Sequence, residues 1–329
     1  MPMTAPPRLM LAQCPTPLAL APATSARLGR SLWIKRDDLT GSHLSGNKVR
    51  KLEWLLADAM AQGATHVITC GGVQSNHCRA TALAAAPLGL KPVLLLKTAN
   101  GKAADLAVPL QGNLLLDRLV GAELRAIDAA TYARWPEAMA AVADEVRAAG
   151  GRPYVIPEGG SSGMGALACA EVVDELATQC AEPPTAIFCA TGSAGTLAGL
   201  AIGVKRRGWP TRVVGVAVLY DAPQIKVMVT RFADEAHAMA GTPKLEESDF
   251  EVLEGFRGRG YALTTPPEMA LIAEVARGDG VVLDPVYTGK AWRGMLAWLG
   301  AADPAAAARP VFVHTGGLFG LMAFGSEIV

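Results

Sequence analysis

Residues 66–96 read HVITCGGVQSNHCRATALAAAPLGLKPVLLL and contain the pattern that decides the fold. The run 66–70 is short, apolar and rich in β-branched residues, which favours a buried strand. Gly71-Gly72 ends this run, a helical segment follows at 79–88, and a second apolar run occupies 93–96. A strand, a helix and a strand in this order predict a parallel sheet covered by helices on both faces.

The same alternation continues on both sides of this unit. Apolar residues at helical spacing predict an amphipathic helix between Ser45 and Gly63. We expect further strands at the apolar runs 154–156, 186–189, 213–218, 281–283 and 311–313. We interpret the charged segment 231–256 as surface helices and loop, and the Ala-rich segment 301–308 as solvent-facing. Ligands of such folds bind at the carboxyl ends of the strands, so we expect the functional residues in the turns that follow the strands.

Composition excludes several classes of protein. The chain has 329 residues, enough for about two domains of ~150 residues each. Its 30 basic residues balance its 30 acidic residues, so no excess positive field exists to hold nucleic acid. A hydrophobic fraction of 51% excludes disorder. Six cysteines without a CxxC pair, and no histidine at metal-ligand spacing, predict buried thiols in a reducing compartment and no metal site.

We expect a cytoplasmic protein without a membrane partner. The longest charge-free stretch, 183–204, has the length of a membrane span, but its middle is a polar, Gly-rich turn. A buried strand, a loop and a helix fit this stretch better than a span. The apolar run 9–12 near the N-terminus is too short for the core of a signal peptide.

A Gly-rich turn follows the expected strand 186–189 and opens into a helix. Gly192, Gly195 and Gly199 supply the glycines, with Ser193 and Thr196 between them. Such a turn directs several backbone N–H groups and the positive end of the helix dipole at one point, which suits a phosphate group. The spacing matches neither the dinucleotide fingerprint nor the P-loop. The alternative is a turn that serves close packing alone.

Two other turns carry polar groups. Lys48 stands at the head of the first long helix, where a cation is disfavoured, and neighbouring cations would lower the pKa of its amine as a Schiff-base lysine requires. The alternative is a surface lysine. In segment 71–77, free N–H groups and polar side chains could bind a carboxylate, or Ser75 or Asn76 could simply cap a helix. We interpret His77 as a packed, structural histidine.

Segments 284–290 and 314–317 follow late apolar runs, so their hydroxyl groups are expected at the same sheet edge. Each alone is a turn with a hydrogen-bonded hydroxyl. Together with a lysine and a phosphate-binding turn, they outline a site for pyridoxal 5′-phosphate.

Five segments carry a family resemblance: IKRDD (34–38), LSGNKVRKLE (44–53), GVQSNHCR (72–79), LDPVYTGK (283–290) and VHTGG (313–317). The chain resembles the fold-type II pyridoxal-phosphate enzymes, which are tryptophan synthase β-like, in the branch with D-cysteine desulfhydrase and 1-aminocyclopropane-1-carboxylate deaminase. The resemblance implies an α/β fold with two open, twisted, mostly parallel sheets flanked by helices. It implies a larger cofactor-binding domain at 1–50 and 161–329, a smaller inserted domain at 51–160, and a homodimer.

The resemblance also implies roles for individual residues. Lys48 forms the Schiff base with the cofactor, and Asn76 hydrogen-bonds the oxygen on its ring. The phosphate-binding turn is Thr191, Gly192, Ser193, Ala194, Gly195 and Thr196, helped by Lys51. The family has glycine where this chain has Ala194, and a methyl group is tolerated there if the backbone keeps a negative φ.

On the substrate side, the resemblance assigns Ser75 and two tyrosines, Tyr261 and Tyr287, as active-site residues. The loop Glu158-Gly159-Gly160-Ser161 is similar to one near the substrate. Lys48 is the expected base for the Cα proton, and Tyr287 the expected aid to the departing thiolate.

Two positions divide the branch. The deaminases have Glu and Leu where this chain has Thr288 and Thr315, which resembles the desulfhydrases. A carboxylate beside the pyridine nitrogen makes a stronger electron sink than a hydroxyl, and loss of a good leaving group from Cβ needs less of one. The expected activity is β-elimination of D-cysteine to pyruvate, hydrogen sulfide and ammonia. The alternatives are the deaminase, a cysteate sulfo-lyase, and a cofactor-binding or regulatory protein without turnover.

Overall fold

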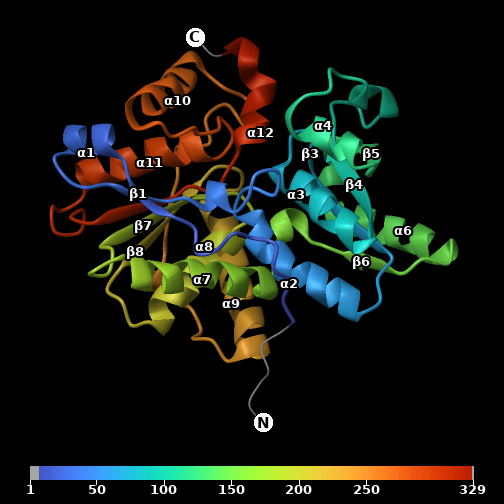
Figure 1. The fold of residues 1–329 in the computed structure, drawn as a ribbon, viewed down its shortest axis with the longest axis horizontal. Coiled ribbons are helices and arrows are strands. Elements are labelled where there is room, and N and C mark those ends of the chain that lie inside the picture. The colour runs from blue at the N-terminus through green and yellow to red at the C-terminus, as the bar shows by residue number, and fades with distance from the viewer. Residues whose placement is uncertain (1–6, 328–329) are drawn as a thin grey trace.

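The structure, a computed structural model, describes residues 7–327 and contains two sheets that lie side by side (Figure 1). The strands are β1 (Leu18–Leu20), β2 (Trp33–Lys35), β3 (His66–Gly72), β4 (Lys91–Lys97), β5 (Glu123–Ile127), β6 (Pro153–Val155), β7 (Ala186–Thr191), β8 (Arg212–Ala217), β9 (Glu251–Leu253) and β10 (Pro310–Val313). The α-helices are α1 (Pro22–Leu28), α2 (Lys48–Ala61), α3 (Asn76–Ala85), α4 (Gly112–Leu119), α5 (Ala129–Ala133), α6 (Trp135–Ala148), α7 (Gly163–Gln179), α8 (Gly195–Arg206), α9 (Ala222–Ala240), α10 (Pro266–Asp279), α11 (Thr288–Ala301) and α12 (Leu318–Leu321). Short 3₁₀ turns are η1 (Asp37–Leu39), η2 (Ala86–Leu88), η3 (Ala103–Leu106), η4 (Glu158–Gly160), η5 (Glu247–Asp249) and η6 (Met322–Glu327).

The larger sheet has six strands in the order β1-β2-β10-β7-β8-β9, all parallel except β1. Helices α7, α8 and α9 lie on one side of it and α10 and α11 on the other (Figure 1). In β7, Ile187 and Cys189 pack on the first group of helices, while Phe188 packs against Trp298 of α11 on the opposite face. Burial on both faces explains why this strand is apolar throughout instead of alternating.

The smaller sheet has four parallel strands in the order β5-β4-β3-β6. Helices α2 and α3 cover one face of β3, and α6 covers the other. These four strands lie between residues 66 and 155, inside the segment expected as the inserted domain. The boundaries 50/51 and 160/161 stay a prediction.

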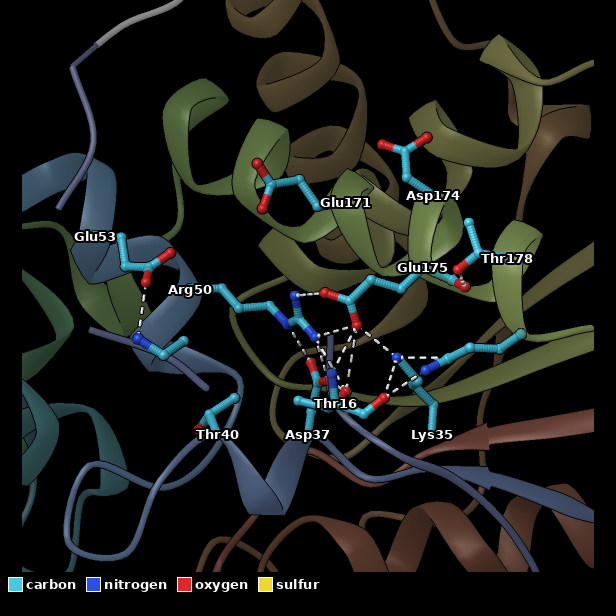
Figure 2. Close-up of polar contacts among 12 residues, drawn as sticks. Thr16, Lys35, Asp37, Thr40, Arg50, Glu53, Glu171, Asp174, Glu175 and Thr178 are labelled. Atoms are coloured by element: carbon cyan, nitrogen blue, oxygen red, sulfur yellow. Dashed lines mark hydrogen bonds and ion pairs between the residues drawn. The ribbon is translucent and has the colours of Figure 1, made fainter. Parts of the chain in front are cut away.

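Helix α2 connects the two sheets, because it packs against both α3 and α7. Its first turn is fixed by Arg50, whose guanidinium bonds Asp37 of η1 at 2.8 Å and Glu175 of α7 at 2.6 Å (Figure 2). Lys35 of β2 also pairs with Glu175, at 2.5 Å, and Thr16 donates to Asp37. Arg50, Asp37 and Lys35 are buried and Glu175 is partly exposed, so this network holds the head of α2 on the larger sheet largely away from solvent.

Most of the expected elements are present, with two corrections. Segment 281–283 is not a strand: Val281 and Leu283 are buried, but no strand in the described part of the chain pairs with them. An extended apolar segment can therefore pack on the core without joining the sheet. Segment 231–256 is not helix and loop alone, since it contains the edge strand β9, paired with β8.

The stretch 183–204 forms β7, the turn and the start of α8, as expected. None of the helices in the described part of the chain combines the length and the apolar character that a membrane span requires.

Candidate active site

A pocket lies where the carboxyl ends of β3, β4 and β7 face one another across the gap between the sheets. The expected site residues that line it are Lys48, Ser75, Asn76, Thr191, Gly192, Ser193, Ala194, Gly195, Thr196, Tyr261, Tyr287 and Thr315. The loop residues Glu158 and Gly159 line it too. Residues from seven separate segments of the sequence thus line one pocket, at the strand edge where ligands of such sheets bind.

Lys48 is the first residue of α2, and its amine donates to Asn47 Oδ1 at 3.0 Å. It has no ion-pair partner among residues 7–327. Burial lowers the pKa of this amine to about 7, and the nearby charge of Lys51 adds to the effect. A substantial share of the amine is therefore uncharged at neutral pH, which is the nucleophilic form.

The loop that carries Lys48 is held from two sides. The backbone N–H of Asn47 donates to the carbonyl of Thr315, after β10, at 3.2 Å. Arg79 of α3, which is buried, donates to the carbonyl oxygens of His43 and Ser45. These hydrogen bonds fix the loop before Lys48, and so the position of its amine, through residues of both halves of the fold. No local pattern in the sequence indicates such long-range contacts.

At the start of α3, Ser75 caps the helix, since its hydroxyl oxygen accepts from the N–H of Cys78 at 3.2 Å. This confirms the capping role, and it leaves the hydroxyl proton of Ser75 free to donate into the pocket. Asn76 accepts from Asn113 through its carbonyl oxygen at 3.0 Å, which leaves its NH₂ group as a donor. The helix start therefore offers two donors to an anionic or carbonyl group.

The turn after β7 is tightly packed and lies at the start of α8. A Cβ on Gly195 would lie 2.6 Å from Ser161 Oγ and 2.8 Å from Lys51 Nζ, so only glycine fits there. Ala194 has φ +61°, so the condition of a negative φ is not met, and the turn stores about 1 kcal/mol of backbone strain. Asn47 donates to Thr196 Oγ1 at 2.7 Å and ties this turn to the residue before Lys48.

Lys51 lies behind this turn and does not line the pocket itself. Its buried ammonium donates to the carbonyl of Gly159 at 3.2 Å and to Ser161 Oγ at 3.0 Å, which are both neutral acceptors. Burying a cation that has only neutral partners is energetically unfavourable unless an anion lies nearby. The turn, its hydroxyl groups and this ammonium fit the phosphate of pyridoxal phosphate, and the Lys48 amine fits its aldehyde.

The two expected tyrosines touch each other. Tyr287 donates to the hydroxyl of Tyr261 at 3.3 Å, and their rings pack edge to face. Burial raises the pKa of both, to about 12 for Tyr261, so both hydroxyls stay protonated at neutral pH. Tyr287 uses its hydroxyl proton in the hydrogen bond to Tyr261. The hydroxyl proton of Tyr261 therefore remains available for a hydrogen bond to a substrate.

Thr288 and Thr315 occupy different surroundings. The hydroxyl of Thr288 is buried and donates to Asp284 Oδ1 at 2.7 Å, and it is not among the residues that line the pocket. Thr315 lines the pocket, and its carbonyl holds the loop of Lys48. Thr315 therefore lies at the pocket, whereas Thr288 does not line it.

His77 is buried and packed, as interpreted from the sequence. Its Nε2 bonds Thr69 Oγ1 at 2.8 Å. Burial and the charges of Lys48 and Lys51 lower its pKa well below the usual value, so the ring is neutral.

Sequence reasoning missed two polar side chains of the pocket, Lys97 and Tyr132. Lys97 is the last residue of β4, and the rule of searching each strand's carboxyl end could have found it. Tyr132 lies in α5, and its hydroxyl donates to Glu158, as does that of Tyr220 at 2.9 Å. No local signal marks either contact.

Comparison with known proteins places the chain in a family. The model of the pyridoxal-phosphate dependent enzymes matches residues 9–316. A D-cysteine desulfhydrase of Salmonella choleraesuis is 40% identical over 326 residues, 98% of this chain and 97% of that protein. A mitochondrial bifunctional D-cysteine desulfhydrase/1-aminocyclopropane-1-carboxylate deaminase of Arabidopsis thaliana is 40% identical over 320 residues, 94% of this chain and 78% of that protein. The crystal structure of an ACC deaminase homologue has a TM-score of 0.89 at 36% identity, covering 99% of this chain and 96% of that one.

Proposed function

The chain belongs to the pyridoxal-phosphate dependent enzymes, and we propose that it converts D-cysteine to pyruvate, hydrogen sulfide and ammonia by β-elimination. One observation carries this proposal: an amine with a pKa of about 7 shares its pocket with an anion-binding turn and a pair of protonated tyrosines. The closely similar desulfhydrase supports the choice of substrate.

The roles follow from the contacts. Pyridoxal phosphate, when bound, withdraws electrons from Cα of the amino acid and so acidifies its proton. The turn 191–196 and Lys51 hold the phosphate, and Asn76 donates to the ring oxygen. Lys48 takes the Cα proton on its uncharged amine, and Ser75 donates to the substrate carboxylate. Tyr261, with Tyr287 behind it, donates a proton to the departing thiolate.

The deaminase is the alternative, favoured by the bifunctional relative. One observation argues against the deaminase reaction. Among the described residues that line the pocket, Glu158 is the one carboxylate, and it already accepts hydrogen bonds from the hydroxyls of Tyr132 and Tyr220. A carboxylate paired with the pyridine nitrogen would strengthen the electron sink that opening a cyclopropane demands. The pocket favours substrates with a good leaving group on Cβ.

The deciding experiment measures product release by the yellow, cofactor-loaded protein from D-cysteine, L-cysteine, L-cysteate and 1-aminocyclopropane-1-carboxylate in parallel. We expect pyruvate with sulfide from D-cysteine at the highest kcat/KM. Preference for the cyclopropane, detected as 2-oxobutyrate, would overturn the proposed reaction and leave the fold and cofactor in place. A protein that binds the cofactor and turns over none of the four would support a binding or regulatory role.

Lys51→Met should weaken the binding of pyridoxal phosphate by about 10- to 100-fold, because it removes the buried positive charge behind the phosphate-binding turn. Equilibrium titration of the apoenzyme measures this affinity. Pyridoxal, which lacks the phosphate, is the matched ligand, and its affinity should hardly change. Equal losses for both ligands would mean that Lys51 supports the fold of the turn and does not bind the phosphate. Lys91→Met, at the exposed start of β4, is the control for the lost charge.

A homodimer is the proposed assembly. Leu115 and Leu119 of α4 and Leu318 of α12 are exposed apolar side chains, and α4 contacts α12. Large exposed side chains on neighbouring helices are typical of an interface. Light scattering that gives the mass of one chain at micromolar concentration would contradict this assembly.

We place the protein in the cytoplasm. All six cysteines are free, and burial raises the pKa of the Cys70 and Cys78 thiols, which suits a reducing compartment. Cell fractionation tests this location, and recovery in another compartment would contradict it.

A further inference from the structure

Asn113, in the first turn of α4, is fully buried, and each polar atom of its side chain has a partner. Its amide oxygen accepts from Nε of Arg79 at 3.1 Å. Its NH₂ group donates to the carbonyl oxygen of Gln74 at 2.9 Å and to the amide oxygen of Asn76 at 3.0 Å. The pocket residue Asn76 is therefore connected through Asn113 to a buried guanidinium.

The chemistry of these partners permits one orientation of the Asn113 amide. A guanidinium can only donate a hydrogen bond, and a backbone carbonyl can only accept one. If the amide were turned over, its NH₂ group would face Nε–H of Arg79 and its oxygen would face the carbonyl oxygen of Gln74. Both hydrogen bonds would be lost in a buried place, which is unfavourable. The NH₂ group of Asn113 is thus fixed toward Asn76.

The fixed amide in turn orients Asn76. The group of Asn76 that can accept from the NH₂ of Asn113 is its carbonyl oxygen, so its own NH₂ group stays available as a donor at the pocket. The opposite orientation would present an oxygen to the pocket instead. Asn113, which lies 37 positions further along the chain, therefore decides whether Asn76 offers a donor or an acceptor to a ligand.

Arg79 joins this chain of hydrogen bonds to the loop before Lys48. Its other two nitrogen atoms donate to the carbonyl oxygens of His43, at 2.5 Å, and Ser45, at 2.9 Å. The aldehyde and the ring oxygen of pyridoxal phosphate are attached to adjacent ring atoms, so the Lys48 amine and the Asn76 donor have to be placed relative to each other. A single guanidinium that is bonded toward both segments meets this requirement.

We propose that Asn113, itself oriented by Arg79, is a positioning residue that turns the amide of Asn76 so that its NH₂ group donates to the ring oxygen of pyridoxal phosphate. The inference rests on the contact proposed above between Asn76 and that oxygen. Asn113 does not line the pocket and acts through Asn76. A donor at this point stabilises the ionised ring oxygen, whereas an oxygen atom at the same point would repel it.

The test compares pyridoxal 5′-phosphate with 3-deoxypyridoxal 5′-phosphate, which lacks the ring oxygen. The holoenzyme is equilibrated with a mixture of the two, and borohydride reduction followed by mass spectrometry of the Lys48 peptide gives the ratio of the bound ligands. In Asn113→Asp, the new side chain has acceptor oxygens alone, so it attracts the NH₂ group of Asn76 and turns the amide oxygen toward the ring. The ratio of pyridoxal phosphate to the deoxy ligand should fall about 10- to 100-fold below that of the wild type.

Further variants separate this role from charge and from folding. Gln111→Glu, the matched control, adds the same charge at an exposed side chain at the start of the same helix and should keep the wild-type ratio. Asn113→Ala removes the link without adding a charge and should lower the ratio about 3- to 10-fold. Asn76→Ala should lower the ratio too, and in this background Asn113→Asp should cause no additional fall, because the residue through which it acts is absent.

A wild-type ratio in both Asn113 variants, or an equal fall in Gln111→Glu, overturns the positioning role. An additional fall caused by Asn113→Asp in the Asn76→Ala background overturns it as well. If Asn76→Ala lowers the ratio and the Asn113 variants do not, the contact proposed for Asn76 stands and the positioning role alone is refuted. A wild-type ratio in Asn76→Ala refutes both. The β-elimination reaction is decided separately, by product release from D-cysteine.

Discussion

Lys48→Ala should abolish turnover and the visible absorbance of the bound cofactor, because it removes the amine that pyridoxal phosphate attaches to and the base for the Cα proton. The expected loss in kcat is at least about 10³-fold, the scale of combined nucleophilic and base catalysis. Borohydride reduction followed by mass spectrometry of peptides provides a second readout. The modified lysine should be Lys48 in the wild type, and no lysine should replace it in the variant.

The pH dependence gives a further check on Lys48. Burial and the charge of Lys51 lower the pKa of its amine to about 7, so the reactive, uncharged form increases as pH rises through 7. The rate at which the apoenzyme takes up pyridoxal phosphate should increase over the same range. A midpoint near 10, the value of an ordinary lysine, would contradict the assigned surroundings. Retained activity in Lys48→Ala would end the assignment altogether.

Arg50→Met should lower the free energy of unfolding by about 3–5 kcal/mol, because it leaves the carboxylates of Asp37 and Glu175 without their shared cation. Arg50 and Asp37 are shielded from water, so solvent cannot replace the lost contacts (Figure 2). Urea unfolding of the holoenzyme measures the effect. Arg125→Met, which breaks exposed pairs with Glu123 and Glu145, is the control and should cost less than about 1 kcal/mol. A similar cost for both variants would refute the special role of the buried network.

The same network predicts acid sensitivity. Burial raises the pKa of Glu175, but the hydrogen bond and charge of Arg50, with a contribution from Lys35, outweigh it and lower the pKa to about 2. A carboxyl group with a lowered folded-state pKa contributes stability above its unfolded value, near 4.5, and loses it as pH falls toward 2. Unfolding free energies measured between pH 6 and 3 should fall in the wild type, and the slope should be smaller in Arg50→Met.

The sequence by itself determined most of the elements and the family. The apolar run 66–70 became β3, the turn after 186–189 joined β7 to α8, and Lys48 stands at the head of α2. These features depend on periodicity, glycine placement and helix-start preferences, which act over a few residues and are visible in one segment at a time. The quoted motifs placed the chain in a family that the comparisons confirm.

The tertiary structure decided which polar groups remain available. Thr288 donates its hydroxyl proton to Asp284, Tyr287 donates to Tyr261, and Glu158 accepts from Tyr132 and Tyr220. Segment 281–283 packs on the core without a strand partner among residues 7–327. Except for the local Thr288–Asp284 contact, these hydrogen bonds join segments far apart in the chain. Local sequence patterns specify the competing groups, and their positions in the fold decide which partner each one keeps.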